Sequence, residues 1–348
     1  MAAFMVVLGL MSGTSLDGLD LALVRFFDGG KKYKLLSAFT YKYSDEWVSL
    51  LRYARKLSKK ELSDLHVNFG DLLGQLAVDF LKGKEKPDLI SSHGHTIFHQ
   101  PANGITLQIG DLNRIALTTG IKTVGDFRRL DVLKGGQGAP LVPVGDDLLF
   151  SEYDYCVNLG GISNYSTFHE NQRIAKDISP CNIVSNIFSL KLGAEYDENG
   201  GFGKKGNIKD DLLQKLETWS YYTEGKSLGI EDIERDFIPI LDDYESAVED
   251  KLRTYYEHIG KVIGSYLVGG RSKKALFTGG GVKNLFLMNC IEKFSDCNII
   301  VPSNEIIDFK EAIIFGLLGY LRINNKTNIL SSVTGASSDS CSGEISCV

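Results

Sequence analysis

The feature that most constrains this chain is a glycine-rich stretch between two predicted strands near its start. The apolar run 4–10 predicts a buried strand, and the alternating run 21–26 predicts a second. Between them lies G-L-M-S-G-T-S-L-D-G-L-D, residues 9–20. Glycine lets backbone amides approach an anion closely, and hydroxyl groups add donors. The stretch indicates either a phosphate-binding turn or an ordinary hairpin turn, because Gly, Ser and Asp are also the common turn residues.

Two carboxylates, Asp17 and Asp20, belong to the same turn. Beside a phosphate they require a cation, as when Mg²⁺ bridges protein oxygens and nucleotide phosphates. If the turn binds phosphate, we therefore expect a Mg²⁺-nucleotide there, with Asp17 as the metal ligand. The cofactor-binding residues of the turn would be Gly13, Thr14, Ser15, Leu16, Asp17, Gly18, Leu19 and Asp20.

Length and composition exclude several classes of protein. The 348 residues, 43% of them hydrophobic, exceed what one core usually serves, so we expect two domains. The net charge is −6 and the basic residues are scattered, which argues against nucleic-acid binding. No apolar run has the length of a membrane span, and the apolar start lacks the basic region of a signal peptide. The 6 cysteines form no C-x-x-C pair, which favours a reduced, cytoplasmic protein.

The chain repeats one kind of unit, in which three strands are followed by alternating helices and strands. The first unit has predicted strands at 4–10, 19–27, 34–43, 88–92, 106–109 and 122–124, and helices over 44–57 and 62–80. The second has predicted strands at 155–159, 163–168, 173–176, 275–278 and 298–301, a long helix around 255–267, and helices from 283 and over 309–321. Each unit is an α/β layer, and two such layers predict a ligand-binding cleft. We place the domains at 1–130 and 131–322.

Two further glycine turns follow predicted strands of the second unit. They are Gly160-Gly161 and Gly279-Gly280-Gly281. One such turn would be weak evidence, but three in two matching units predict two phosphate-binding turns and a third near the nucleoside. No G-x-x-x-x-G-K-[ST] occurs, so the chain has no Walker A loop. The one strict G-x-G-x-x-G, at 201–206, does not follow a predicted strand, so it is not a dinucleotide-binding fingerprint.

Longer motifs are spread along nearly the whole chain. They are S-H-G-H-T at 92–96, L-Q-I-G-D at 107–111, G-D-F-R-R-L-D-V-L-K-G-G-Q-G-A-P-L-V-P at 125–143, V-N-L-G-G-I-S-N at 157–164, T-G-G-G-V-K-N at 278–284, D-F-K-E-A at 308–312 and S-V-T-G-A at 332–336. With the first turn, this series resembles the anhydro-N-acetylmuramic acid kinases of the sugar kinase, heat-shock ATPase and actin superfamily. The resemblance implies two ribonuclease-H-like, actin-type ATPase domains flanking a nucleotide cleft, with ATP and Mg²⁺ as cofactors. It also implies that the tail, about 323–348, packs back on the first domain.

The resemblance implies a reaction of peptidoglycan recycling and amino-sugar catabolism. Such kinases open the 1,6-anhydro ring of anhydro-N-acetylmuramic acid with water and phosphorylate the freed O6 from ATP, which gives N-acetylmuramic acid 6-phosphate. A carboxylate base helps water to attack the anomeric carbon. Mg²⁺ and backbone donors stabilise the charge on the transferred phosphoryl group.

Two catalytic carboxylates follow from the same resemblance. The family motif F-D-T-G-P-G-N is similar to K-D-I-S-P-C-N at 176–182, which makes Asp177 the candidate base and Asn182 a substrate contact. Ser179 and Cys181 stand where the family often has glycine. Glu311 matches a family glutamate that helps to position the water. Without the resemblance, a charge at a helix N-terminus would be the favoured role of Asp177 and an equal alternative for Glu311.

Substrate contacts are also expected from His93, Gly94, Arg128 and Arg129. An arginine fork suits the lactyl carboxylate of the sugar, but a structural pair between these arginines and Asp131 is an equal alternative. The H-x-H pattern of 93–95 is typical of metal-dependent hydrolases. The remaining histidines supply no convincing further ligands, so a sugar-contacting loop is favoured.

The competing hypothesis for the whole chain is an ATP-binding switch or filament protein of the same superfamily without sugar chemistry. Asp177 favours the kinase, because a switch protein needs no base that activates water. A homodimer is a hypothesis that no residue pattern decides. The expected partner is the anhydro sugar, and we expect binding neither to nucleic acid nor to a membrane.

Overall fold

A computed structural model describes residues 4–13, 15–224 and 227–347 of the chain. Its contacts divide the chain into two compact units. Unit 1 comprises Met1–Ser151, Asn171–Arg173 and Phe309–Val348, and unit 2 comprises Glu152–Glu170 and Ile174–Asp308. These bounds differ from the predicted domains, because residues 131–151 and 309–322 pack within unit 1.

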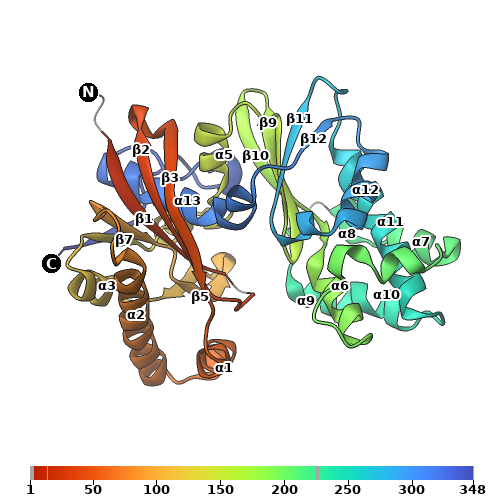
Figure 1. Ribbon diagram of the computed structural model, residues 1–348, viewed down its shortest axis with the longest axis horizontal. Helices are drawn as coiled ribbons and strands as arrows, with labels where there is room; N and C mark the ends of the chain where they lie inside the picture. Colours follow the sequence, from red (N-terminus) through yellow and green to blue (C-terminus); the bar gives the residue numbers. More distant parts are fainter. Residues whose placement is uncertain (1–3, 14, 225–226, 348) are drawn as a thin grey trace. The chain divides into compact units, whose positions relative to one another are not determined.

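Unit 1 is built on a sheet with the strand order β13-β7-β4-β1-β2-β3 (Figure 1). Its strands are β1 (Met5–Ser12), β2 (Leu19–Phe27), β3 (Lys32–Tyr41), β4 (Leu89–Ser92), β7 (Thr123–Gly125) and β13 (Glu344–Ser346), with a separate hairpin of β5 (His95–Gln100) and β6 (Ile105–Ile109). The first three strands pair antiparallel in succession, whereas β1, β4 and β7 run parallel. The helices are α1 (Asp45–Tyr53), α2 (Lys59–Leu81), α3 (Leu112–Thr119), α4 (Arg129–Leu133), α5 (Pro143–Leu149), α13 (Asn304–Ile323) and α14 (Ser331–Thr334).

Successive side chains of β1 point to opposite faces of the sheet, and both faces are buried, so residues 5–11 of the strand are all apolar or glycine. Leu8 and Leu10 belong to the core that Phe69 and Leu73 of α2 complete. Gly9 points to the opposite face, where a Cβ atom would meet the backbone of Ala312 in α13. The strand is therefore buried on both faces, and only glycine allows α13 to pack this closely.

Unit 2 is built on a sheet with the order β10-β9-β8-β11-β12. Its strands are β8 (Tyr155–Leu159), β9 (Ile162–His169), β10 (Gln172–Pro180), β11 (Lys274–Thr278) and β12 (Asn298–Ile300). Strands β8, β11 and β12 run parallel, and β9 is antiparallel to β8. The helices are α6 (Asn182–Leu190), α7 (Asp210–Glu217), α8 (Tyr221–Glu224), α9 (Ile230–Asp232), α10 (Ile238–Asp242), α11 (Val248–Tyr266) and α12 (Leu285–Phe294).

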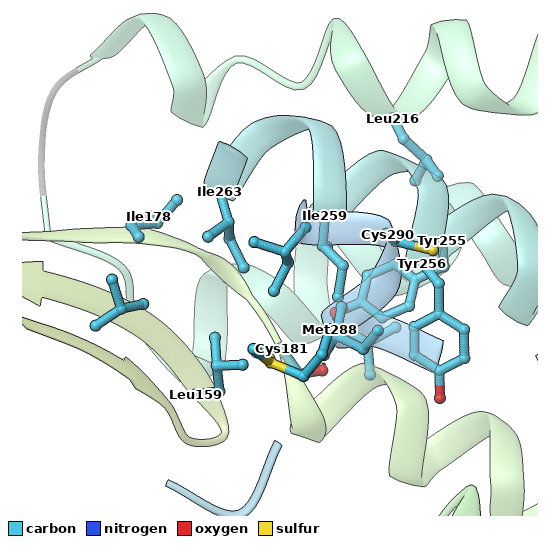
Figure 2. Close-up of a cluster of buried hydrophobic side chains, with 14 of the residues drawn as sticks. Leu159, Ile178, Cys181, Leu216, Tyr255, Tyr256, Ile259, Ile263, Met288 and Cys290 are labelled. Carbon is cyan, nitrogen blue, oxygen red and sulfur yellow. Dashed lines mark hydrogen bonds between the residues drawn. The ribbon is translucent and has the colours of Figure 1, made fainter. Parts of the chain in front are cut away.

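The core of unit 2 lies between this sheet and its longest helix. Figure 2 shows Ile259 and Ile263 of α11 beside Leu159 and Ile178 of the sheet. Tyr255 is fully buried in the same cluster. The predicted apolar side of this helix is therefore its buried side.

The two sheets share one strand order, with three consecutive strands on one side and parallel strands beside the first of them. This repeated topology is that of the ribonuclease-H-like domains of actin-type ATPases, so the predicted fold class is confirmed. The C-terminal segment contributes to unit 1, where β13 pairs antiparallel with β7. Among the described residues, no helix combines the length and the apolar character needed to cross a membrane.

Candidate active site

The turn between β1 and β2 is the first part of the predicted nucleotide site. Leu16 adopts a φ of 63° and Gly18 a φ of 156°. A Cβ atom added at Gly18 would collide with the Tyr41 carbonyl oxygen. Leu16 donates its amide to the Gly13 carbonyl oxygen over 3.3 Å. The close turn therefore depends on Gly18. Thr14, also predicted here, lies outside the described residues.

The side chains of this turn differ in exposure. Ser15 and Asp17 are exposed, Asp20 is half-buried, and Leu19 is fully buried in the core of unit 1. Thr40 Oγ1 donates to Asp20 Oδ1 over 2.5 Å. Leu19 can therefore contact a ligand only through its backbone, whereas Asp17 has an accessible carboxylate.

The fit of Mg²⁺ to this turn rests on Asp17. No cluster of three or more acidic, histidine or cysteine side chains that could hold a metal occurs among the described residues. Mg²⁺ is commonly bound by one or two carboxylates together with phosphates and water, and not by a cage of protein ligands. An exposed carboxylate at a turn that is predicted to bind phosphate fits that mode of binding.

A buried hydrogen-bond chain supports the end of β1, directly before the turn. Tyr43 donates its hydroxyl to Ser12 Oγ over 2.7 Å, and Ser12 Oγ lies 2.9 Å from Nδ1 of His95. Burial lowers the pKa of His95 to about 4, so its imidazole is neutral near pH 7. The hydrogen-bond chain fixes Ser12 and gives His95 a structural partner.

His93 and Arg128 lie together in unit 1. His93 donates from Nδ1 to the Gly94 carbonyl oxygen over 2.9 Å, and its Nε2 accepts from Arg128 Nη2 over 3.0 Å. Burial and the charge of Arg128 lower the pKa of His93 to about 3. Arg128 also donates from Nη1 to the Gly138 carbonyl oxygen over 3.0 Å.

One donor of Arg128 is not used by the protein. Its Nε atom is buried and has no hydrogen-bond partner among the described residues. Burial lowers the pKa of Arg128 to about 10, which still leaves the guanidinium charged near pH 7. A buried cationic donor without a partner fits an anionic substrate group.

Arg129 and Asp131 have different surroundings from Arg128. Arg129 Nη1 lies 3.2 Å from Glu344 Oε1, and both side chains are largely exposed. Asp131 is fully buried and accepts from the Gly138 amide and from Thr334 Oγ1, each over 2.7 Å. A direct ion pair of Arg128 or Arg129 with Asp131 does not occur among the described residues. Arg128 and Asp131 instead both bind Gly138, so they fasten the glycine-rich loop, as the structural alternative expects.

A cavity of about 390 Å³ in unit 1 brings several predicted substrate contacts together. Its lining includes His93, Gly94 and Arg129, which were predicted, and Gln108 and Asn113, which were not. Polar and apolar groups both line it, and the charged side chains include both signs. Such a surface suits a polyhydroxylated ligand with an amide or carboxylate substituent.

Glu311 lies inside α13, well beyond its first turn. The helix begins at Asn304, and the Ser303 carbonyl oxygen accepts from the amides of Ile306 and Ile307. The alternative role at a helix N-terminus is therefore wrong for Glu311, because the dipole effect is confined to the first turn. Burial raises the pKa of Glu311, as do the charges of Asp20 and Asp146, against Lys310 and Arg128.

The glycine turns of unit 2 lie at the ends of β8 and β11. The Gly161 carbonyl oxygen accepts from the amide of Cys181, directly before α6, over 2.8 Å. The Gly160 carbonyl oxygen accepts from the amide of Asn182, the first residue of α6, over 3.0 Å. Within the described part of the chain, the amides of the two glycines donate no hydrogen bond. These two donors are available to a ligand.

The turn at 279–281 packs against the end of β8. Gly279 has a φ of 86°, and a Cβ atom there would lie 2.5 Å from Asn158 Oδ1. At Gly281 a Cβ atom would lie 2.7 Å from Leu159 Cβ and 2.8 Å from Asn182 Oδ1. Gly280 is open by comparison, with Asn182 Nδ2 at 3.9 Å. Asn182 is itself tied to β8, because its Nδ2 donates to the Leu159 carbonyl oxygen over 2.9 Å.

Asp177 lies in β10, before that strand ends at Pro180. Its Oδ2 accepts from the Leu228 amide over 3.0 Å, and burial raises the pKa of the carboxyl group. Because α6 begins only at Asn182, the alternative role at a helix N-terminus is wrong for Asp177. Ser179 is accommodated in the core, where its hydroxyl lies 2.9 Å from Ser163 Oγ.

The structure brings the predicted residues together in two groups. Unit 1 holds the first turn, His93, Arg128 and Glu311, and unit 2 holds the other two glycine turns, Asn182 and Asp177. Sequence reasoning missed Asp146 and Lys310, which accompany Glu311 in unit 1. The charged residues of D-F-K-E-A were the available signal for Lys310, and no pattern marked Asp146.

Comparison with known proteins identifies the family of the chain. The family model described as anhydro-N-acetylmuramic acid kinase matches residues 5–347. A protein of that name from Haemophilus influenzae is 34% identical over 364 residues and covers 95% of both chains. Another, from Vibrio parahaemolyticus, is 31% identical over 353 residues and also covers 95% of both. The chain belongs to the anhydro-N-acetylmuramic acid kinase family.

Proposed function

We propose that this chain is an ATP-dependent kinase of peptidoglycan recycling and amino-sugar catabolism. It opens the 1,6-anhydro ring of anhydro-N-acetylmuramic acid with water and phosphorylates O6, which gives N-acetylmuramic acid 6-phosphate. The observation that carries the proposal is the family match over residues 5–347. A cytoplasmic location fits the cysteines, all of which are free.

Asp177 is the proposed base of the hydrolytic step. Its carboxylate takes a proton from water as the water oxygen attacks the anomeric carbon. The bond between that carbon and O6 breaks, and its electron pair stays on O6. The raised pKa of Asp177 supports this role, because burial makes the carboxylate a stronger base.

O6 then attacks the γ-phosphorus of ATP, and ADP leaves. The unused amides of Gly160 and Gly161 and the turn that ends at Gly18 would hold the phosphates. Mg²⁺, when bound at Asp17, neutralises charge on the phosphates. Glu311 would position the attacking water by accepting a hydrogen bond from it.

Arg128 is the proposed contact of the lactyl carboxylate. Its buried Nε is the donor that the protein leaves without a partner. We place the remainder of the sugar near the cavity that His93, Gly94 and Arg129 line. A neutral His93 keeps its Nε2 lone pair toward Arg128, which orients the guanidinium.

Isotope labelling tests the reaction. The product formed in ¹⁸O-water should carry the label at the anomeric hydroxyl group, which mass spectrometry can locate. Label in the phosphate group would instead indicate hydrolysis of ATP and would contradict the mechanism. ATP turnover should also depend on the anhydro sugar, whereas a switch protein would hydrolyse ATP without it.

A further inference from the structure

A buried cluster of charged side chains lies directly beside Glu311 in the chain. Lys310 Nζ is 2.6 Å from Asp146 Oδ1, and Arg173 Nη2 is 3.9 Å from Asp146 Oδ2. The exposed fractions of the side chains are 5% for Lys310, 4% for Asp146 and 1% for Arg173. The Lys310 ammonium group also lies 5.4 Å from the centre of the Phe150 ring.

A buried cluster of charged side chains contributes little to the stability of a fold. Removing charges from water opposes folding, and apolar residues of similar volume are often as stable or more stable. The cluster therefore requires an explanation beyond packing. Its connections to the proposed catalytic residues supply one.

Asp146 pairs with two residues of unit 1, and each of them lies in sequence near a proposed catalytic carboxylate. Lys310 directly precedes Glu311 on α13. Arg173 lies near the start of β10, the strand that carries Asp177 further along. The Ser332 hydroxyl also donates to the Arg173 carbonyl oxygen over 2.7 Å, which holds that end of the strand.

Charged groups on several elements influence the pKa of Glu311. The acidic groups are Asp20 of β2 and Asp146 of α5, and the basic groups are Lys310 of α13 and Arg128 before α4. With Glu311 and Arg173, these residues form a balanced set of three acids and three bases. The loss of either partner of the central ion pair would leave a buried charge and change the field at Glu311.

We propose that Asp146 is a positioning residue for Glu311, which it places and charges correctly through its buried ion pair with Lys310. This inference rests on the proposed function only in taking Glu311 as a catalytic group. In this proposal Asp146 acts through Lys310 and Glu311, and not on the reacting atoms directly. The proposal predicts that the two partners of the pair act on Glu311 in opposite directions.

The test is a ¹³C NMR titration of the glutamate carboxyl groups, in which the Glu311 signal is the one absent from Glu311→Gln. Asp146→Asn removes a nearby negative charge, so the pKa of Glu311 should fall. Lys310→Met removes a nearby positive charge, so the pKa of Glu311 should rise. Asp146 stays ionised in this variant, because Arg173 still lies beside it. Asp71→Asn is the matched control, because it breaks an exposed pair with Arg114 in the same unit.

Rates with the anhydro sugar complete the test. Asp146→Asn should lower kcat by about 10²-fold, the effect of a small displacement of a catalytic group, and Asp71→Asn should not. If either single variant does not fold, the double variant Asp146→Asn, Lys310→Met is used, because it leaves neither charge of the pair unpaired. The double variant should fold, and its kcat should still be low.

Shifts of the Glu311 pKa in the same direction, or no shift, would overturn the proposal. So would wild-type kcat in the folded double variant. The proposed function fails separately, if the wild-type protein does not phosphorylate the anhydro sugar. The titration needs no activity and still decides the role of Asp146 in that case.

Discussion

His93 Nε2 accepts a hydrogen bond from Arg128 Nη2 over 3.0 Å, while His93 Nδ1 donates to the Gly94 carbonyl oxygen. The two contacts fix the tautomer of His93, since Nε2 must carry the lone pair. The same contacts fix the plane of the guanidinium, which Gly138 holds from the other side. Arg128 is therefore a rigid donor, and its Nε is the part that has no partner among the described residues.

Arg128→Lys should raise the KM for the anhydro sugar. Lysine keeps the charge but loses the planar fork, and a hydrogen bond to a charged group contributes about 1.5–3 kcal/mol, or roughly tenfold to a hundredfold in affinity. The KM for ATP should not change. Arg114→Lys is the control, because Arg114 pairs with Asp71 at the surface of the same unit and does not line the cavity. Equal effects of the two substitutions would argue against Arg128 as the carboxylate contact.

Histidine burial predicts acid sensitivity of the fold. Burial lowers the pKa of His258 to about 3 from an ordinary 6.5. Between pH 6.5 and pH 3, His258 is protonated in the unfolded chain but stays neutral in the folded chain. Protonation therefore favours the unfolded chain, so the free energy of unfolding is highest above pH 6.5 and decreases as the pH falls toward 3.

His258→Gln should reduce this dependence, because glutamine can still form a hydrogen bond with the Tyr222 hydroxyl group and does not titrate. Denaturant unfolding between pH 4 and pH 7 measures the effect. The slope of the unfolding free energy against pH should decrease by up to about 1.4 kcal/mol per pH unit. Parallel slopes for both proteins would show that His258 does not contribute.

Two neighbouring glycines should respond differently to alanine. Gly279→Ala places a Cβ atom at a positive φ and against Asn158, so we expect it to destabilise unit 2 by about 1–3 kcal/mol. Gly280→Ala meets no close atom, so the fold should be kept. If this turn contacts the nucleotide, Gly280→Ala should still raise the Kd for ATP in calorimetry. Unchanged ATP binding in that folded variant would remove the turn from the site.

Regular periodicity made most of the fold predictable from the sequence. Strand β2 at Leu19–Phe27 and strand β8 at Tyr155–Leu159 have their predicted bounds, because apolar runs that end in turn residues define them. Helix α1 begins after Ser44, whose hydroxyl accepts from the Trp47 amide as expected of an N-cap.

Elements that depend on distant partners could not be derived in this way. Strand β13 forms only because the edge of β7 is open to it, and its sequence is short and polar. Helix α13 begins at Asn304, before its continuous apolar stretch, so its predicted start was late. Strand β10 continues to Pro180 and carries Asp177, which local patterning had assigned to the approach of a helix.

The candidate site shows the same division. Motif resemblance selected Asp177 and Glu311 as carboxylates, but their surroundings come from tertiary contacts. The Leu228 amide reaches Asp177 from a segment far along the chain. Asp146 had no local signal, because one aspartate in a short helix looks like a surface charge until Lys310 is packed against it.

The central prediction concerns Asp177→Asn. The amide oxygen can still accept from the Leu228 amide, so folding and ATP binding should remain nearly intact. The amide cannot accept the proton of water, and loss of a general base typically costs about 10²–10⁴-fold in rate. We therefore expect kcat to fall that far with little change in the KM for ATP, measured in a coupled ADP assay with the anhydro sugar.

The pH dependence of the wild-type rate provides a second measure of the same group. The base must be ionised, and burial raises the pKa of Asp177 above the ordinary 3.8, so kcat should fall as the pH drops through that raised value. Asp154→Asn is the control, because it removes a carboxylate of unit 2 that pairs with exposed Lys273. It should leave both kcat and the acid limb in place. Near-wild-type turnover of Asp177→Asn would reject the assignment, and Glu311→Gln in the same assay would then show whether Glu311 is the base.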